Sequence, residues 1–129
     1  VLASYEFELP WPRPPLNLND RRHWRANAAK VRQVRDASHI LAKQCGIGPW
    51  PRVRVTLHYI PRDRRVRDAE NPTPTLKAVC DGIVDAGIVR DDSPKFMVKD
   101  MPVIHPAASV SGLRPRLWVV IAALTWESA

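Results

Sequence analysis

Four stretches of the chain have the apolar patterns expected of β-strands, and they span residues 4–9, 53–59, 96–103 and 117–126. In the first, Tyr5, Phe7 and Leu9 alternate with polar residues, so they are expected on one face of a strand that Pro10 ends. The second stretch shows the same period of two. The fourth is almost continuously apolar, which predicts a strand in the centre of the sheet.

Two further stretches predict helices. From about Ala26 to Cys45, apolar or small residues recur at intervals of three and four, and Gly46 is expected to close this helix. A second apolar stripe begins past a turn expected at residues 72–74, and Gly87 suits its end. The segments between these elements are expected to be loops and turns, at residues 11–19, 46–51, 90–94 and 105–115.

The order of these elements predicts the fold class. Strand, helix, strand, helix, strand, strand indicates an α+β (mixed α/β) fold, with a small mixed sheet of about four strands and two main helices packed on it. A chain of 129 residues can bury one continuous core but is too short for two. We therefore expect a single domain over residues 1–129.

Composition adds a strong basic bias. The 20 Lys and Arg residues outnumber the 13 Asp and Glu residues and give a net charge of +7, which favours an anionic partner such as nucleic acid. A merely solvated basic surface is the alternative. No apolar run reaches the roughly 18 residues needed to span a bilayer. The first ten residues also lack the pattern of a secretion signal, so we expect a cytoplasmic protein without a membrane partner.

The cysteines and histidines predict no structural metal. Cys45 and Cys80 are isolated and lie in stretches expected to be helical, which favours reduced, buried thiols over a disulfide. The four histidines are scattered without the spacing of a zinc site.

The carboxylates around two of the predicted turns indicate a site for a hard cation. Asp68 and Glu70 are two positions apart, so in an extended segment both side chains would project to the same side. A third carboxylate from Asp91 or Asp92 would complete an oxygen-rich site suited to Mg²⁺. Such a metal can activate water for attack on phosphorus, which is phosphodiesterase chemistry. The alternative is that these acids only offset nearby arginines as exposed ion pairs, each worth roughly 0–1 kcal/mol.

Residues near these acids could contact a phosphate. Lys77 could stabilise the charge of a phosphoryl transition state, or it could simply pair with Asp81 at i,i+4. Four arginines could grip phosphate oxygens or could form a solvated turn, and these are Arg62, Arg64, Arg65 and Arg67. The loop with Asn17 and Asn19, together with Trp11 and Trp24, could also contact nucleic acid. For the two tryptophans, packing in the core is an equally good explanation.

The order of three motifs resembles the signature of the RusA-like Holliday-junction resolvases, a family of small dimeric endodeoxyribonucleases. The motifs are R-D-A-E-N, then L-K-A-V-C-D-G-I-V-D-A-G-I-V, then D-D-S-P. Y-E-F-E-L-P-W-P near the start and V-K-D-M-P-V before the last strand are similar too, so the resemblance runs along nearly the whole chain. The P-T-L-K form of the second motif is similar to phage and prophage members.

The resemblance implies roles for single residues. Asp68, Glu70 and Asp92 match the family's metal-binding acids, with Asp91 as the fallback for the third, and Lys77 matches its catalytic lysine. It also implies a RusA-like fold, a homodimer, Mg²⁺ with Mn²⁺ as a substitute, and no small-molecule cofactor. Two features depart from the family pattern: Glu70 stands where Asp is usual, and residues 72–74 lengthen the link to Lys77.

The expected function is therefore a Mg²⁺-dependent, structure-selective endodeoxyribonuclease that resolves Holliday junctions and other branched DNA by paired symmetric nicks. The first alternative is a catalytically inactive or weakly active basic DNA-binding protein of the same fold. A nuclease that acts on RNA or on ordinary duplex ends is a third possibility, because the chemistry of a metal site is indifferent to sugar and branching.

Overall fold

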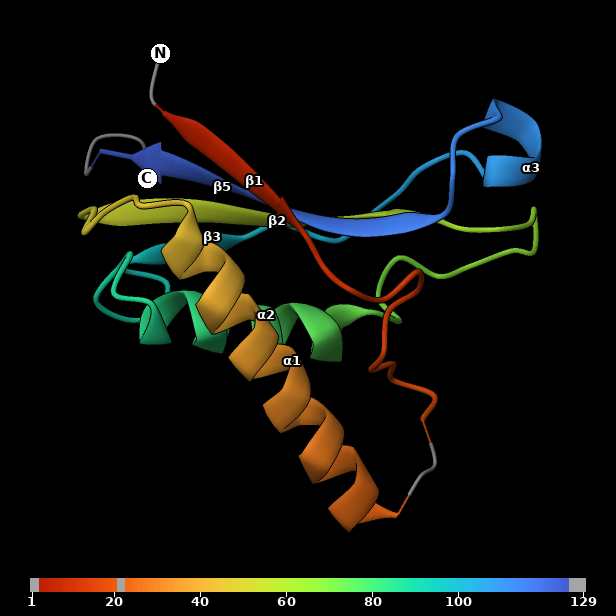
Figure 1. The fold of residues 1–129 in the computed structure, drawn as a ribbon, viewed down its shortest axis with the longest axis horizontal. Helices are drawn as coiled ribbons and strands as arrows, with labels where there is room; N and C mark the ends of the chain where they lie inside the picture. The colour runs from red at the N-terminus through yellow and green to blue at the C-terminus, as the bar shows by residue number, and fades with distance from the viewer. Residues whose placement is uncertain (1–2, 21–22, 126–129) are drawn as a thin grey trace.

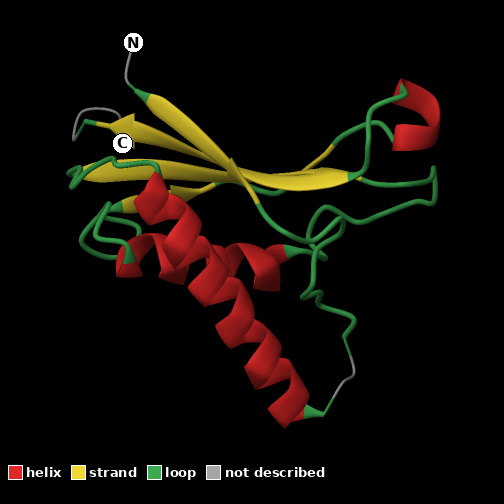
Figure 2. Ribbon diagram, in the orientation of Figure 1, coloured by secondary structure: helices red, strands yellow, loops and turns green. Residues whose placement is uncertain are grey.

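A computed structural model describes residues 3–20 and 23–125 (Figures 1 and 2). Its elements follow in the order β1 (Ser4–Glu8), α1 (Trp24–Gln44), β2 (Arg52–Ile60), α2 (Thr73–Asp85), β3 (Met97–Lys99), β4 (Val103–Ile104), α3 (Ala108–Ser111) and β5 (Arg116–Leu124). The mixture of helices with one mixed sheet confirms the predicted α+β class. The predicted last strand also included Trp126, which lies outside the described residues.

The sheet has the order β1-β5-β2-β3, and β4 also pairs with β2. β5 is antiparallel to both β1 and β2, whereas β3 and β4 are parallel to β2. The predicted central position of residues 117–126 is confirmed for the described part, because β5 lies between two neighbours.

Over residues 3–20 and 23–125 the sheet has five strands rather than about four, because the strand expected at residues 96–103 is divided in two. Pro102 has no N–H to donate to a ladder. The side chain of Asp100 instead accepts hydrogen bonds from Arg54 (3.1 Å) and Thr56 (2.7 Å) of β2. These two hydrogen bonds hold the Asp100 carboxylate against β2 at the break between β3 and β4.

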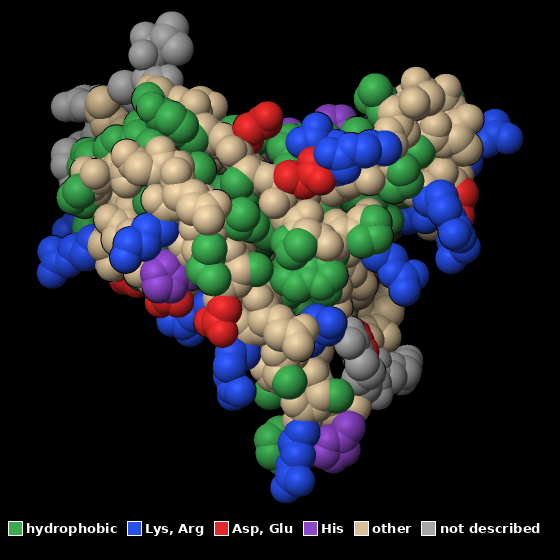
Figure 3. Space-filling view, in the orientation of Figure 1, with side chains coloured by type: hydrophobic (Ala, Val, Ile, Leu, Met, Phe, Trp, Pro, Cys, Tyr) green, Lys and Arg blue, Asp and Glu red, His purple; other side chains and the backbone are tan. Residues whose placement is uncertain are grey.

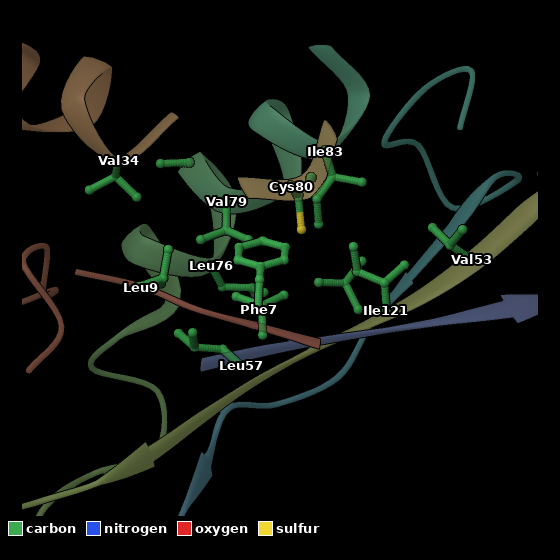
Figure 4. Close-up of a cluster of buried hydrophobic side chains, with 14 of the residues drawn as sticks. Phe7, Leu9, Val34, Val53, Leu57, Leu76, Val79, Cys80, Ile83 and Ile121 are labelled. Carbon is green, nitrogen blue, oxygen red and sulfur yellow. The ribbon is translucent and has the colours of Figure 1, made fainter. Parts of the chain in front are cut away.

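Helices α1 and α2 pack against one face of the sheet and cross each other (Figure 1). The crossing is close at Gly82, where a Cβ atom would lie 2.5 Å from the carbonyl oxygen of Arg35 and 2.7 Å from the Cβ of Ser38. Between the helices and the sheet, apolar side chains point toward one another, among them Val79 and Ile83 of α2 and Val53 and Ile121 of the sheet (Figure 4).

Helix α2 begins earlier than the sequence indicated. The expected turn at residues 72–74 is instead the start of the helix, with Pro72 at the N-cap and Pro74 in the first turn. Proline is tolerated there because the first N–H groups of a helix have no partner within it. Likewise, α1 starts at Trp24, two residues before the expected Ala26.

One other sequence expectation is corrected. Residues 105–115 are not loop throughout, because α3 forms one short turn whose Ala108 N–H donates to the carbonyl of Pro61 (2.7 Å).

The side chains of the first strand differ in burial. Phe7 and Leu9 are buried, whereas Tyr5 is 43% exposed and lies beside Trp50, with 6.0 Å between ring centroids.

Both cysteines are free, as predicted. Cys80 is buried in the core, and Cys45 is half-buried at the end of α1. Among the residues that the structure describes, no helix has the length and apolar character required to cross a membrane.

Candidate functional site

The first part of the candidate site joins α2 to the turn that follows it. The Nζ atom of Lys77 lies 2.9 Å from Asp81 Oδ1 and 2.7 Å from Asp92 Oδ2. Lys99, on β3, donates to the same Asp92 oxygen at 3.0 Å. Lys77 therefore bridges two carboxylates, and Asp92 is held between two ammonium groups.

These contacts change the protonation of the group. Hydrogen bonds from Lys77 and then Lys99 lower the pKa of Asp92 to about 2. The same bond to Asp92, followed by the bond to Asp81, raises the pKa of Lys77. At neutral pH the Asp92 carboxylate is therefore charged, and Lys77 presents a cation that is still 59% exposed.

Asp91 and Asp92 play different parts in their turn. The side chain of Asp91 accepts a hydrogen bond from the backbone N–H of Asp92 (2.8 Å), so it stabilises the local turn. The Asp92 carboxylate is the one that contacts the lysines. Of the two candidates for the third acid, Asp92 is thus the one joined to Lys77.

Asp68 and Glu70 lie in the segment between β2 and α2, and both are exposed. The segment turns here, so the expected extended geometry is wrong. Asp68 Oδ1 accepts a hydrogen bond from the backbone N–H of Glu70 (3.1 Å), and the Asp68 carbonyl accepts one from Asn71 (3.0 Å). This side chain-to-backbone bond is the local competition that Asp offers to extended structure.

The arginines of the same segment divide into two kinds. Arg67 is only 20% exposed and is tied down, donating to Asp63 Oδ1 (2.9 Å) and to the carbonyls of Asp63 (2.7 Å) and Arg65 (2.8 Å). Arg62 and Arg65 are 82% and 74% exposed and reach Asp63 only at 3.9 and 3.6 Å. Arg64 is exposed as well. Arg67 therefore shapes the loop, while the other three present cations to solvent.

A cleft of about 260 Å³ opens beside this segment. Asp68 and Arg65 line one side of it, and Arg13 and Asn17 line another. Asn17 is held by a hydrogen bond to the carbonyl of Pro14 (3.2 Å), and Asn19 donates to the side chain of Asn71 (3.3 Å). The two predicted asparagines thus lie beside the acidic segment, although they are far from it in sequence. Figure 3 shows Lys and Arg side chains gathered over the loop that follows β2.

The predicted metal ligands agree with Mg²⁺ in chemistry but are not assembled around one point. Asp68, Glu70 and Asp92 supply only carboxylate oxygens, the donors that hard cations prefer. Within residues 3–20 and 23–125, however, no three His, Cys, Asp or Glu side chains are grouped so that they could hold a metal ion. Asp92 has its two lysine partners instead.

Sequence reasoning missed two participants. Lys99 reaches Asp92 only because β3 runs parallel to β2, a long-range pairing with no local signal. Arg13 lies in the predicted loop at residues 11–19, and its place in the cleft depends on that loop folding back onto the acidic segment.

Comparison with known proteins identifies one curated relative at low similarity. No family model matches the chain. An uncharacterized protein of Xylella fastidiosa (strain Temecula1) is 30% identical over 94 residues, which cover 67% of this chain and 60% of that protein. The chain thus spans less than two thirds of the length of the curated relative it matches.

Proposed function

We propose that this protein is a Mg²⁺-dependent endodeoxyribonuclease that nicks branched DNA and acts as a homodimer in the cytoplasm. The observation that carries the proposal is the contact between Lys77 and Asp92. The exposed ammonium group of Lys77 lies on α2, the helix that directly follows Asp68 and Glu70, and it contacts a carboxylate 15 residues away in the turn after that helix. The order of these residues is the one that resembles RusA-like resolvases.

In this proposal each group has a separate task. Asp68, Glu70 and Asp92 would hold Mg²⁺, which when bound supplies an activated water and charge neutralisation. Lys77 stays protonated and offers a positive charge to the phosphate under attack. The exposed Arg62, Arg64 and Arg65 attract the flanking phosphates. The net charge of +7 favours a polyanionic substrate.

A panel of substrates tests this proposal. Labelled four-way junction, flap, linear duplex and RNA are incubated with Mg²⁺, with Mn²⁺ and with EDTA. We expect metal-dependent nicking, strongest on branched DNA. Asp68→Asn and Asp92→Asn should each abolish nicking while junction binding in EDTA persists. Asp36→Asn, which removes an exposed carboxylate from α1, is the matched control and should nick normally. Full activity of either site variant would refute the assignment.

One observation favours a second candidate, a DNA-binding protein without catalysis. The three proposed ligands are not grouped, and Asp92 is already neutralised by Lys77 and Lys99. In that case the wild-type protein binds DNA in EDTA but gives no cleavage at any concentration of Mg²⁺ or Mn²⁺. Titration calorimetry with Mn²⁺ alone separates the two candidates further, because only the nuclease requires a metal site.

A further inference from the structure

The first part of α1 extends away from the rest of the fold (Figure 1). None of residues 24–33 is buried, and the buried side chains of this helix begin at Val34. An isolated helix of about ten residues has little stability of its own in water. We call residues 24–33 the α1 arm. Its exposure is what a surface reserved for a partner would show.

The tip of the arm carries an exposed aromatic ring, with His23 and Arg25 as its neighbours in the chain. Trp24 is 67% exposed. Its ring centroid lies 5.6 Å from the His23 ring and 5.2 Å from the Arg25 guanidinium carbon. Rings presented in this way stack on unpaired nucleic-acid bases, whatever the base, because every base has a π-face.

The positive charge of the arm indicates which kind of partner fits it. Arg25, Lys30 and Arg32 lie on it, and the sequence contains no Asp or Glu from residue 24 to residue 35. A second copy of this chain docked here about a two-fold axis would bring these cations together. A polyanion complements them instead.

Two hollows connect the arm to the candidate site. The cleft beside Asp68 is lined in part by Arg13, Pro14 and Asn17. A second groove, of about 520 Å³, is also lined by these three residues and continues to Lys30 of the arm. The shared lining makes one path that leads from the acidic segment past Arg13 to α1.

The path is fixed by hydrogen bonds between the chain before α1 and the start of α2. Leu18 N–H donates to the carbonyl of Asn71 (2.9 Å), and Leu16 N–H donates to Thr75 Oγ1 (3.0 Å). The chain that leads to α1 is therefore attached directly after Asp68 and Glu70. With a rise of 1.5 Å per residue, the arm projects about 15 Å, the span of roughly four nucleotides.

We propose that this path is a track for a nucleic-acid strand with unpaired bases. Arg13 and Lys30 hold the phosphates along it, and Trp24, six residues before Lys30 on the same helix, stacks on a base beyond the groove. The choice of DNA as the strand rests on the proposed function, but the track concerns binding and requires no cleavage. The proposal assigns the recognition of unpaired bases to Trp24.

Binding in EDTA tests the track. Fluorescence anisotropy is measured with a labelled four-way junction, a single strand and a duplex of equal length. Trp24→Ala should weaken binding to the junction and the single strand about tenfold and leave duplex binding within about twofold, since stacking on one base is worth roughly 1–3 kcal/mol. Trp24→Phe keeps a ring and should retain most of the affinity. Leu113→Ala, at a side chain that is 60% exposed elsewhere, is the matched control.

The phosphate contacts predict a different signature. Arg13→Ala and Lys30→Ala should weaken all three DNAs to a similar degree and lower the salt dependence of binding by about one ion each. Lys43→Ala removes an exposed lysine from the far end of the same helix and should change neither quantity. A circular-dichroism spectrum identical to wild type confirms that each variant is folded.

Two results would overturn the track. One is a Trp24→Ala variant that binds all three DNAs like wild type. The other is a change in oligomeric state in that variant by sedimentation, because the arm would then be an interface between copies. The outcomes are separable from those of the nuclease test: selective loss of junction binding supports the track even if no metal produces nicking.

Discussion

Lys77 on α2 and Asp92 in the turn after that helix form a 2.7 Å ion pair. The chain reverses direction after α2, and this reversal brings the two side chains together. The pair lies at the surface, where an isolated ion pair contributes little to folding. We therefore expect the pair to contribute to the proposed reaction more than to stability.

Lys77→Met should reduce nicking of a four-way junction by about 100-fold or more, the usual cost of losing a charge that stabilises a transition state. Junction affinity in EDTA should fall less than threefold, since one lysine among many cations is lost. Single-turnover cleavage and anisotropy measure the two quantities. Lys43→Met is the control, and equal losses of binding and rate would contradict a role confined to the reaction.

Lys99→Met should raise the pKa of Asp92 from about 2 toward its ordinary value of 3.8, because Lys99 donates the second hydrogen bond to that carboxylate. Carbon-detected NMR of the metal-free protein follows the carboxyl group through an acid titration. The pKa should rise further in Lys77→Met, whose hydrogen bond is the larger cause. An unchanged pKa in both variants would mean that the lysine contacts do not persist in solution.

Arg35→Gln should destabilise the protein by about 0.5–1 kcal/mol at pH 7. Arg35 donates two hydrogen bonds, of 2.6 and 2.8 Å, to Asp85, so α1 is pinned to the end of α2. The bond lowers the pKa of Asp85 below 3.8, so the stabilisation is present above pH 3.8 and disappears as the pH falls through the folded-state value. Urea unfolding at pH 7 and near pH 2 measures this. Arg32→Gln, one turn away, should show no such dependence on pH.

Gly82→Ala should destabilise the fold by roughly 1–3 kcal/mol although alanine favours helices. The new Cβ would meet backbone atoms of α1, namely the Arg35 oxygen at 2.5 Å and the His39 nitrogen at 2.9 Å, and neither can rotate away. Thermal unfolding gives the difference. Ala28→Leu adds more volume to an exposed position of α1 and should stay within about 0.5 kcal/mol of wild type.

Cys80 should resist thiol reagents in the folded protein. Burial raises the pKa of its thiol to about 12, so very little thiolate exists at pH 8. Cys45 is half-buried and should react first. Labelling of the Cys45→Ser variant isolates Cys80, whose modification should proceed only as fast as the protein unfolds. Rapid labelling of that variant would show that the core opens locally.

Patterns with a local cause were predicted well from the sequence. The period of two found β1 and β2, the nearly continuous apolar run found β5, and the apolar stripe of α2 placed Lys77 on its exposed side. The contact of Lys77 with Asp81 follows directly from helical spacing. The free cysteines likewise agreed with their isolated positions in the chain.

Features that depend on distant partners could not be predicted. The helix α3 forms where Ala108 and Ser109 donate to carbonyls after β2. Tyr5 follows the alternation of its strand, yet it lies beside Trp50 near the surface rather than in the core. Asp68 was expected in an extended segment, but its side chain bonds to the backbone two residues on. In each case a contact absent from the local pattern decided the outcome.

The close crossing of α1 and α2 at Gly82 lies in the second half of α1 and so leaves the first part of that helix projecting from the crossing. The second half of the helix is held by the buried Val34, Ser38 and Ala42, whereas none of residues 24–33 is buried and Val31 packs only partly against the core. A tilt of about 10° at the fulcrum displaces the free end by roughly 3 Å over an arm of about 15 Å. For a given change in the crossing angle, Trp24 at the first residue of the helix is therefore displaced more than any residue nearer the crossing.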